Sequence, residues 1–243
     1  MIEKKINYIW LGGKPKSKIA NICINSWKEK LPDYEIIEWN EKNLNLIEIS
    51  KENRYIKECI KRKLWAYVSD YIRLKILYEN GGIYFDTDVQ VLKSFNSFLS
   101  QEAFIGMQSN HNYSAGVIAT EKGNVAIKAI IDFYNNDIWN NDFYTINAVI
   151  KAVFTENSEL LKHIKIYSKE YFDPIDFVRG FREEDISENT YSLHWYNASW
   201  ANNKQVKIFL QTKHIRNPLK KRVIYIKKLL SYYYHKRVRK HFI

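Results

Sequence analysis

One stretch, residues 65–92, constrains the fold more than any other, because a helical pattern there runs directly into a strand pattern. Apolar residues recur every four positions, the spacing of one buried helical face, at Leu64, Val68, Ile72 and Ile76. Gly81 and Gly82 then end the helix, because glycine adopts the positive φ of a helix C-terminus without strain. The β-branched, aromatic and alternating residues of 83–91 predict a strand directly after it.

The predicted strand carries an Asp-x-Asp motif. A period of two places Tyr84, Asp86 and Asp88 on one side of the strand, with the two aspartates roughly 6 to 7 Å apart at Cα. Half-buried carboxylates at this separation repel each other, and a divalent cation removes that repulsion. Mg²⁺ or Mn²⁺ accepts oxygen ligands and usually brings substrate phosphates with it. Many Asp-x-Asp tripeptides are only solvated turns, so the surrounding helix, Gly-Gly and strand are what favour a metal-diphosphate site here.

The N-terminal part predicts an α/β fold. Residues 6–11 are apolar on both sides apart from Asn7, Ser17 is placed to cap a following helix, and residues 34–39 predict a second strand. Such a βαβ unit is right-handed and binds ligands at the carboxyl ends of its strands. Further strands are predicted at 103–107, 116–120 and 164–167, and further helices at 54–63, 125–134 and 144–153. The length suits one domain, which we assign to residues 1–215.

Three sequence blocks resemble a known enzyme family. Residues 69–89, SDYIRLKILYENGGIYFDTDV, resemble the Asp-x-Asp sugar-binding region of glycosyltransferase family 32, which includes relatives of yeast initiating mannosyltransferases and capsular polysaccharide glycosyltransferases and, more distantly, the glucosylating clostridial toxins. Residues 6–13, INYIWLGG, and 193–200, LHWYNASW, are similar to two other blocks of the family in the same order. The resemblance implies a GT-A-like, Rossmann-type mixed sheet flanked by helices, and a nucleotide-sugar-dependent hexosyltransferase that retains anomeric configuration.

The resemblance also implies roles for individual residues. It implies Mn²⁺ or Mg²⁺ held by Asp86, Asp88, His194 and Ser199. It implies donor binding by Trp10, Asp70, Arg73, Tyr84, Asp86 and Trp200, with Trp10 at the nucleotide base and Trp200 as a lid over the diphosphate. Asn112 is a further donor-binding candidate because of its place in the polar loop after the Asp-x-Asp strand. The predicted catalytic group is Asp70, Arg73, Asp86 and Asp88.

Several of these residues also fit ordinary structural roles. Trp10 also suits a core tryptophan, and Asp70 with Arg73 also suits a surface ion pair worth about 0.3 to 0.5 kcal/mol. The polar loop 108–115 is either a plain hairpin connection or a sugar-binding loop. In a sugar-binding loop, the residues that could contact sugar hydroxyls are His111, Asn112 and Ser114. Residues 144–147, Tyr-Thr-Ile-Asn, depart from the Thr-Gly-Pro-like or Thr-Ser-Pro-like turn of many relatives, which leaves the acceptor side undefined.

The charge of the chain is concentrated at its C-terminus. The formal net charge is +11, yet no acidic residue follows Glu188, whereas 13 of the 38 Lys and Arg do. Residues 216–243 form a predicted basic amphipathic helix, with apolar residues at Leu219, Val223, Ile226, Leu230 and Tyr234. This pattern favours binding to anionic lipid, at roughly 1 kcal/mol per basic residue, over docking of the helix on the domain. No recognised nucleic-acid motif accompanies the charge, so a nucleic-acid partner is not expected.

Localisation is predicted from what the sequence lacks. Cys23 and Cys59 have neither disulfide-framework nor metal-site spacing, as in a reducing compartment. No apolar run has the length of a signal peptide or of a membrane span. These features predict a cytoplasmic protein, peripheral on the inner face of the membrane.

Together these features predict a metal-dependent glycosyltransferase that moves a sugar from a UDP-sugar, favoured over a GDP-sugar, to a glycan or lipid-linked glycan. A bacterial surface polysaccharide such as capsule, O-antigen or lipooligosaccharide is the expected product. A sugar-nucleotide hydrolase, a nucleotidyltransferase and a non-enzymatic membrane adaptor are the alternatives. The sugar, base, linkage, acceptor and oligomeric state are not encoded in any motif identified in the sequence.

Overall fold

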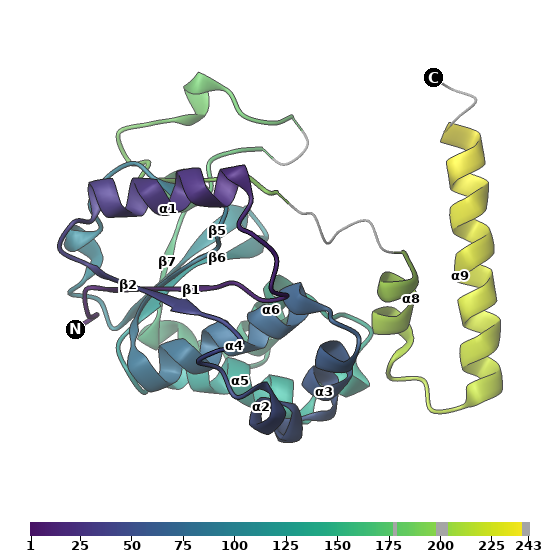
Figure 1. Cartoon of the computed structure of the whole chain (residues 1–243). Helices are drawn as coiled ribbons and strands as arrows, with labels where there is room; N and C mark the ends of the chain where they lie inside the picture. Colours follow the sequence, from purple (N-terminus) through teal and green to yellow (C-terminus); the bar gives the residue numbers. More distant parts are fainter. Residues whose placement is uncertain (177–178, 198–203, 240–243) are drawn as a thin grey trace.

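The computed structural model describes residues 1–176, 179–197 and 204–239. A six-stranded sheet of order β2-β1-β3-β6-β5-β7 has helices on both faces, and a separate two-stranded sheet pairs β4 with β8 (Figure 1). The strands are β1 (Lys5–Ile9), β2 (Glu35–Trp39), β3 (Gly82–Phe85), β4 (Val89–Val91), β5 (Ala103–Ser109), β6 (Asn112–Thr120), β7 (Lys165–Tyr167) and β8 (Ser192–His194). The helices are α1 (Lys18–Lys30), α2 (Leu46–Glu52), α3 (Arg54–Lys61), α4 (Trp65–Asn80), α5 (Val125–Asn136), α6 (Ile146–Glu156), α7 (Lys169–Phe172), α8 (Lys204–Thr212) and α9 (Pro218–Arg239).

The sheet is mixed, as expected for the predicted GT-A-like fold, and this prediction is confirmed. β1 pairs in parallel with β2 and with β3, whereas β3 pairs antiparallel with β6. α4, α5 and α6 cover one face of the sheet and α1 covers the other (Figure 1). The molecule therefore has two apolar cores, one on each side of the main sheet.

The first βαβ unit forms as its sequence pattern indicates. The hydroxyl of Ser17 accepts from the backbone N–H of Ala20 and so caps α1. Trp27, in the buried stripe of α1, is fully buried, and its indole N–H donates to the carbonyl of Val89 at 2.7 Å. This bond attaches α1 to β4, the strand that follows the Asp-x-Asp motif.

The Gly-Gly pair after α4 is required by its surroundings. Gly81 and Gly82 have φ values of +67° and +93°, in the left-handed region that glycine tolerates. A Cβ on Gly82 would lie 2.7 Å from the carbonyl oxygen of Lys5 in the neighbouring strand β1. Glycine at position 82 thus allows β3 to start beside β1 directly after the helix.

The prediction of one continuous strand over residues 83–91 is wrong. β3 ends at Phe85, the backbone N–H of Val89 bonds the carbonyl of Asp86 in a turn, and β4 begins at Val89. The break arises because β4 leaves the main sheet and pairs with β8 instead. The two aspartates consequently lie in the connection between two sheets, where backbone alternation does not set their directions.

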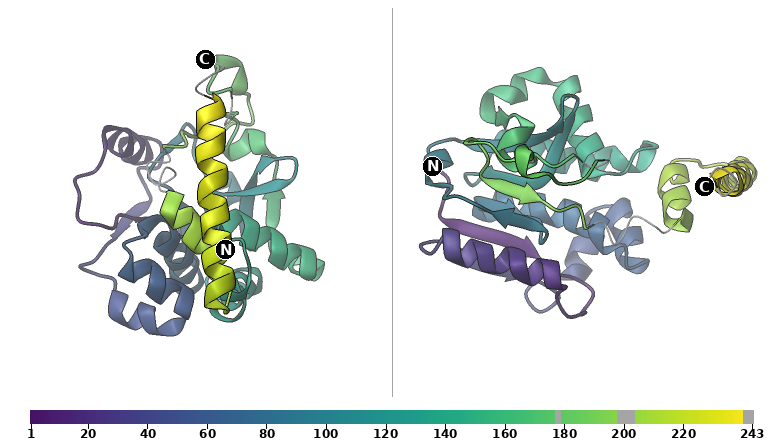
Figure 2. Two further views of the ribbon diagram at one scale, coloured as in Figure 1. Left: turned by 90° about the vertical axis from the view of Figure 1, so that its right-hand side faces the viewer. Right: turned by 90° about the horizontal axis from the view of Figure 1, so that it is seen from above.

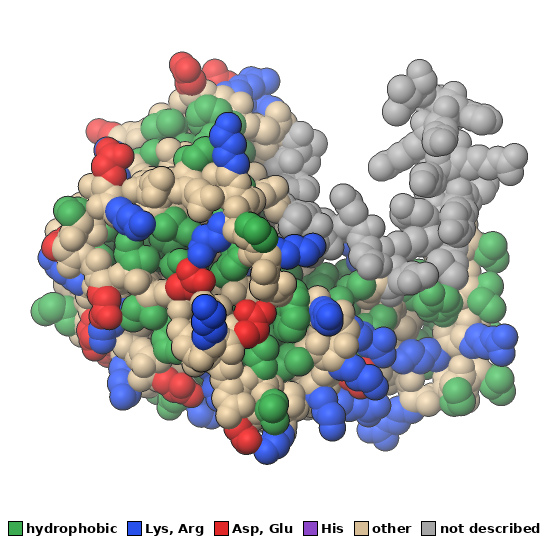
Figure 3. Space-filling model, in the orientation of Figure 1, with side chains coloured by type: hydrophobic (Ala, Val, Ile, Leu, Met, Phe, Trp, Pro, Cys, Tyr) green, Lys and Arg blue, Asp and Glu red, His purple; other side chains and the backbone are tan. Residues whose placement is uncertain are grey.

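The C-terminal helices lie beside the sheet domain. α9 packs against α8 and stands apart from the main sheet in Figure 1 and in the right panel of Figure 2. Figure 3 shows Lys and Arg side chains gathered around α8 and the described part of α9. The apolar stripe of α9 is solvent-exposed at Leu219, Val223, Ile226 and Leu230. None of the described helices combines the length and apolar character needed to cross a membrane.

We predict that Gly82→Ala destabilises the fold more than Gly123→Ala. Both glycines have positive φ, so both alanine variants lose about 1 kcal/mol through backbone strain. Only at position 82 does the added methyl group meet backbone atoms, because a Cβ at Gly123 has no heavy atom within 4 Å. The additional cost at Gly82 should be about 1 to 3 kcal/mol, measured as the free energy of unfolding in urea. Equal losses in the two variants would show that the β1–β3 contact does not require glycine.

Candidate active site

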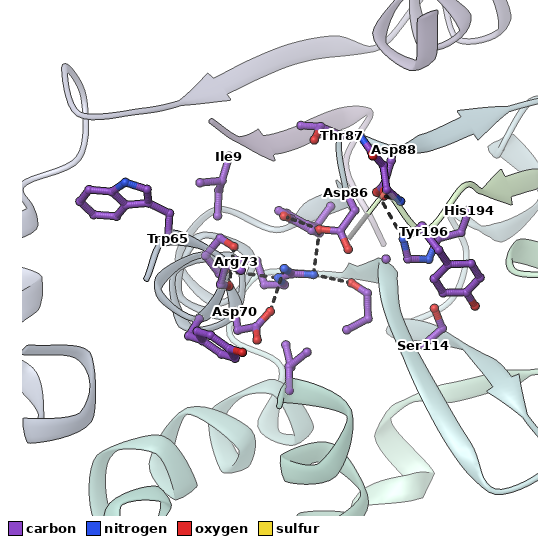
Figure 4. A pocket seen from close by; sticks show the side chains of 18 of the residues that line it. Ile9, Trp65, Asp70, Arg73, Asp86, Thr87, Asp88, Ser114, His194 and Tyr196 are labelled. Atoms are coloured by element: carbon purple, nitrogen blue, oxygen red, sulfur yellow. Dashed lines mark hydrogen bonds and ion pairs between the residues drawn. The ribbon is translucent and has the colours of Figure 1, made fainter. Parts of the chain in front are cut away.

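A cavity of about 560 Å³ opens beyond the carboxyl ends of β1 and β3, where ligands bind in sheets of this kind. Figure 4 shows Trp65 at one end of the cavity and Ser114, His194 and Tyr196 at the other. The Asp70–Arg73–Asp86 cluster lies between these ends.

Arg73 is the centre of this cluster. Its guanidinium group lies 2.9 Å from Oδ1 of Asp70 and 3.1 Å from Oδ1 of Asp86. The same group donates to the carbonyl of Ala115 at 2.8 Å and lies over the ring of Tyr84, 4.5 Å from its centroid. Its side chain is only 5% exposed, so the interpretation of Asp70 and Arg73 as a surface ion pair is wrong. Burial lowers the pKa of Arg73, but the neighbouring carboxylates outweigh burial and hold the pKa above its usual value.

Asp70 has an unusual protonation equilibrium. Burial is the largest influence and raises the pKa of Asp70 to about 6. Arg73 and a backbone hydrogen bond from Ile146 lower it, whereas the charge of Asp86 raises it. This carboxyl group therefore titrates at a higher pH than an ordinary aspartate and is still mostly ionised at neutral pH, and shifted pKa values of this kind are common in functional sites.

Asp88, the second aspartate of the Asp-x-Asp motif, faces His194, which is more than 100 residues away in the sequence. Because Val89 pairs with His194 between β4 and β8, the imidazole Nε2 lies 3.3 Å from Oδ1 of Asp88. The other oxygen of Asp88 accepts from the backbone N–H of Asn197 at 2.7 Å. Burial raises the pKa of Asp88, but bonding to His194 and Asn197 more than offsets burial, and the pKa is lowered overall. Burial likewise lowers the pKa of His194, and Asp173 and Asp88 together raise it well above its usual value.

Asp86, Asp88 and His194 can contribute to one metal site. Each offers a ligand atom, and these atoms all lie within 4.8 Å of one another. Two carboxylates and an imidazole suit Mn²⁺, and the carboxylates also suit Mg²⁺. The donor set therefore fits the divalent cation that the Asp-x-Asp motif predicts.

The structure places the other predicted residues as follows. Trp10 and Tyr84 line the cavity, and the indole N–H of Trp10 donates to the carbonyl of Lys14 at 2.6 Å. Asn112 and His111 are exposed and do not line the cavity, whereas Ser114 from the same hairpin does. Ser199 and Trp200 lie outside the described residues, so their predicted roles stay predictions.

Several lining residues were not identified from the sequence. Trp65, the first residue of α4, provides a second aromatic ring in the cavity wall, and its place at the start of the central helix is the one sequence signal for it. Asn147 donates to the side chain of Gln108 at 2.9 Å, which brings the unusual 144–147 segment into the cavity wall. Tyr196 and Gly116 lie against His194, a contact that required the three-dimensional pairing of β4 with β8.

We predict that Asp70 titrates near pH 6 and that its two charged neighbours shift this pKa in opposite directions. Arg73→Met should raise the pKa of Asp70, because the cation that favours the carboxylate is lost, and Asp86→Asn should lower it, because a repelling charge is lost. The measurement is a ¹³C NMR titration of the Asp70 carboxyl carbon, assigned with Asp70→Asn. A pKa near 4 in the wild-type protein would contradict the burial argument.

Comparison with known proteins supports the resemblance seen in the sequence. Residues 17–105 match a protein family described as "Glycosyltransferase sugar-binding region containing DXD motif". This segment runs from the cap of α1 into β5 and includes Asp86 and Asp88. The resemblance to a DXD-containing glycosyltransferase region is thus confirmed.

Two relatives and one solved structure illustrate the similarity. The chain is 28% identical to "Subversion of eukaryotic traffic protein A" of Legionella pneumophila over 54% of this chain and 24% of that protein. It is 25% identical to a protein named "Toxin" of Photorhabdus asymbiotica over 64% of this chain and 6% of that protein, so it spans only a minor part of either relative. The solved structure "PaToxG Glycosyltransferase" superposes with a TM-score of 0.51 and 21% identity, covering 66% of this chain and 72% of that one. The chain therefore carries a region similar to the DXD-containing sugar-binding region of glycosyltransferases, on a GT-A-like fold.

Proposed function

We propose that this enzyme is a metal-dependent, retaining glycosyltransferase that uses a nucleotide-diphosphate sugar, with a UDP-sugar favoured over a GDP-sugar. The observation that carries the proposal is the convergence of Asp86, Asp88 and His194, whose ligand atoms lie within 4.8 Å of one another at the wall of a 560 Å³ cavity. A divalent cation at such a site stabilises the charge that develops on the departing nucleotide diphosphate.

The lining of the cavity supports a division of roles along its length. The indoles of Trp10 and Trp65 suit a nucleotide base, because flat aromatic rings stack on one another. The carboxylate of Asp70 suits hydroxyl groups of the donor sugar, which are hydrogen-bond donors. Arg73 already bonds Asp70, Asp86 and the carbonyl of Ala115, so we assign it to holding these acidic groups rather than to direct contact with the donor.

We base the proposal of retention on the family resemblance, and no described residue identifies itself as a covalent nucleophile. We therefore propose front-face attack by the acceptor hydroxyl, with its proton passing to the departing phosphate oxygen. In this scheme Asp70 orients the sugar, and Arg73 keeps Asp70 and Asp86 fixed in place.

For the acceptor we propose a glycan or lipid-linked glycan of a bacterial surface polysaccharide. The names of the two relatives favour a second candidate, in which the acceptor is a protein of another organism. Incubation of the enzyme with a radiolabelled donor and either polysaccharide intermediates or eukaryotic cell proteins separates these candidates. Release of free sugar at full rate without any acceptor would instead indicate a hydrolase.

We predict that Mn²⁺ or Mg²⁺ is required for tight binding of the donor. Isothermal titration with a panel of UDP- and GDP-sugars should show one donor that binds in the presence of the cation. Asp88→Asn should weaken this binding by about tenfold or more, because a charged ligand of the cation is lost.

Asp132→Asn is the matched control, because this exposed aspartate pairs with Lys128 on α5 and does not line the cavity. It should bind the donor as the wild type does. Equal donor binding by folded wild-type protein with and without a divalent cation would refute metal dependence.

We further propose that residues 1–215 form the transferase domain and that residues 216–243 bind the inner face of the cytoplasmic membrane. The apolar residues Leu219, Val223, Ile226 and Leu230 share one stripe of α9 and are exposed. Lys and Arg flank the stripe, and no acidic residue lies on α9. A helix of this kind lies in the interface of anionic lipids.

Co-sedimentation with vesicles tests this assignment. We predict that the protein sediments with phosphatidylglycerol vesicles but not with phosphatidylcholine vesicles, and less at high salt, because salt screens the attraction of basic residues. Leu219→Ser combined with Leu230→Ser should reduce sedimentation, whereas Leu161→Ser, an exposed leucine outside α9, should not. Sedimentation that is independent of lipid charge and unchanged by the double variant would contradict a membrane role for α9.

A further inference from the structure

We propose that Asp173 is a positioning residue for the metal site: its carboxylate fixes the orientation and tautomer of His194 so that Nε2 faces the cation. The inference rests on the proposed function, because it concerns a ligand of the proposed cation. Asp173 lies directly after α7, in a part of the sequence where no motif was recognised.

Asp173 is a buried acid with a well-defined set of neighbours. Its exposed fraction is 1%. Oδ2 accepts from the hydroxyl of Ser114 at 2.6 Å, and Oδ1 accepts from the hydroxyl of Tyr196 at 2.6 Å. Nδ1 of His194 lies 3.5 Å from Oδ2, within the range of an ion pair. A buried carboxylate is costly unless it is bonded, so two hydroxyl donors and a nearby imidazole indicate a defined role for this side chain.

Several residues of the described part of the chain contact the ring of His194 and fix its position. Tyr196 stacks on it with ring centroids 4.3 Å apart and planes inclined by 28°. A Cβ at Gly116 would lie 2.9 Å from Nδ1, so glycine at this position of β6 makes room for the imidazole. Nε2 lies 3.3 Å from Asp88, on the opposite side of the ring from Asp173.

This arrangement determines which nitrogen is available to a metal. Only a neutral imidazole nitrogen without a proton can donate its lone pair to a cation. A proton on Nδ1 pointing toward Asp173 leaves Nε2 free on the side of Asp86 and Asp88. Nδ1 is buried and has no well-formed hydrogen bond to any described residue, which leaves the nearby carboxylate of Asp173 as its acceptor. Carboxylates behind ligating histidines act in this way in many metal sites.

The test is titration of the protein, residues 1–243, with Mn²⁺, without donor, followed by electron paramagnetic resonance. Continuous-wave spectra give the dissociation constant of Mn²⁺, and pulsed spectra report nitrogen coupling from a coordinated imidazole. Asp173→Ala should weaken Mn²⁺ binding by about 10- to 100-fold and remove or reduce the nitrogen coupling. Asp173→Asn, which keeps the volume of the side chain, should act in the same direction and serves as the test if the alanine variant does not fold.

Two control variants make the outcome interpretable. His194→Ala should abolish the nitrogen coupling, which assigns the signal. Ser114→Ala removes one bond to Asp173 but keeps the carboxylate, so it should change Mn²⁺ affinity much less than Asp173→Ala.

Failure of this inference can be distinguished from failure of the proposed function. If the wild type shows nitrogen coupling that His194→Ala removes, while folded Asp173 variants keep the coupling and the affinity, the metal site stands and the role of Asp173 is refuted. If the folded wild-type protein binds no Mn²⁺ or shows no nitrogen coupling, His194 is not a ligand and the assignment to Asp173 is overturned with it.

Discussion

The repulsion among three carboxylates at one cavity, Asp70, Asp86 and Asp88, and a fourth behind its wall, Asp173, is the constraint on which the rest of the site depends. Two clusters hold these carboxylates: Arg73 lies between Asp70 and Asp86, and His194 lies between Asp88 and Asp173. Arg73 is a permanent cation, whereas the charge of His194 depends on its protonation. A divalent cation between the two clusters would supply the remaining positive charge and would lie where Asp86, Asp88 and His194 already converge.

The chain passes from the main sheet to the small sheet between the two aspartates of the Asp-x-Asp motif, and this crossing brings the charged groups together. Asp86 follows β3 of the main sheet, and Asp88 precedes β4, which belongs to the small sheet with β8. His194 ends β8 and therefore reaches Asp88 through the backbone pairing of these two strands. Any distortion of that pairing moves the imidazole relative to the carboxylate, which links the stability of the small sheet to the chemistry of the site.

Sequence patterns predicted those parts of the fold that depend only on residues close together in the sequence. The cap at Ser17, the four-residue spacing from Leu64 to Ile76 and the glycines at 81 and 82 identified α1, α4 and the start of β3, because capping, periodicity and positive φ are local properties. The break after Phe85 and the order of the sheet depend on pairing between distant strands, which no local period encodes.

The same distinction applies to the site. Asp86, Asp88 and Arg73 belong to one recognisable stretch, whereas Asp173 and Gly116 acquire their roles only when the chain is folded around His194. Neither a single aspartate after a short helix nor a glycine within a strand carries a sequence signature of such a role. Trp65 is a different case, since its position at the start of the central helix was visible in the sequence but its direction toward the cavity was not.

The most direct test of the account is a crystal structure of the protein with Mn²⁺ and a nucleoside diphosphate, with the ion located by its anomalous scattering. The account predicts one strong peak within about 2.0 to 2.4 Å of ligand atoms from Asp88 and His194, with Asp86 bound directly or through water and the diphosphate on the open side. A diphosphate bound in the cavity with no anomalous peak beside Asp88, or a peak ligated by other residues, would contradict the proposed metal site.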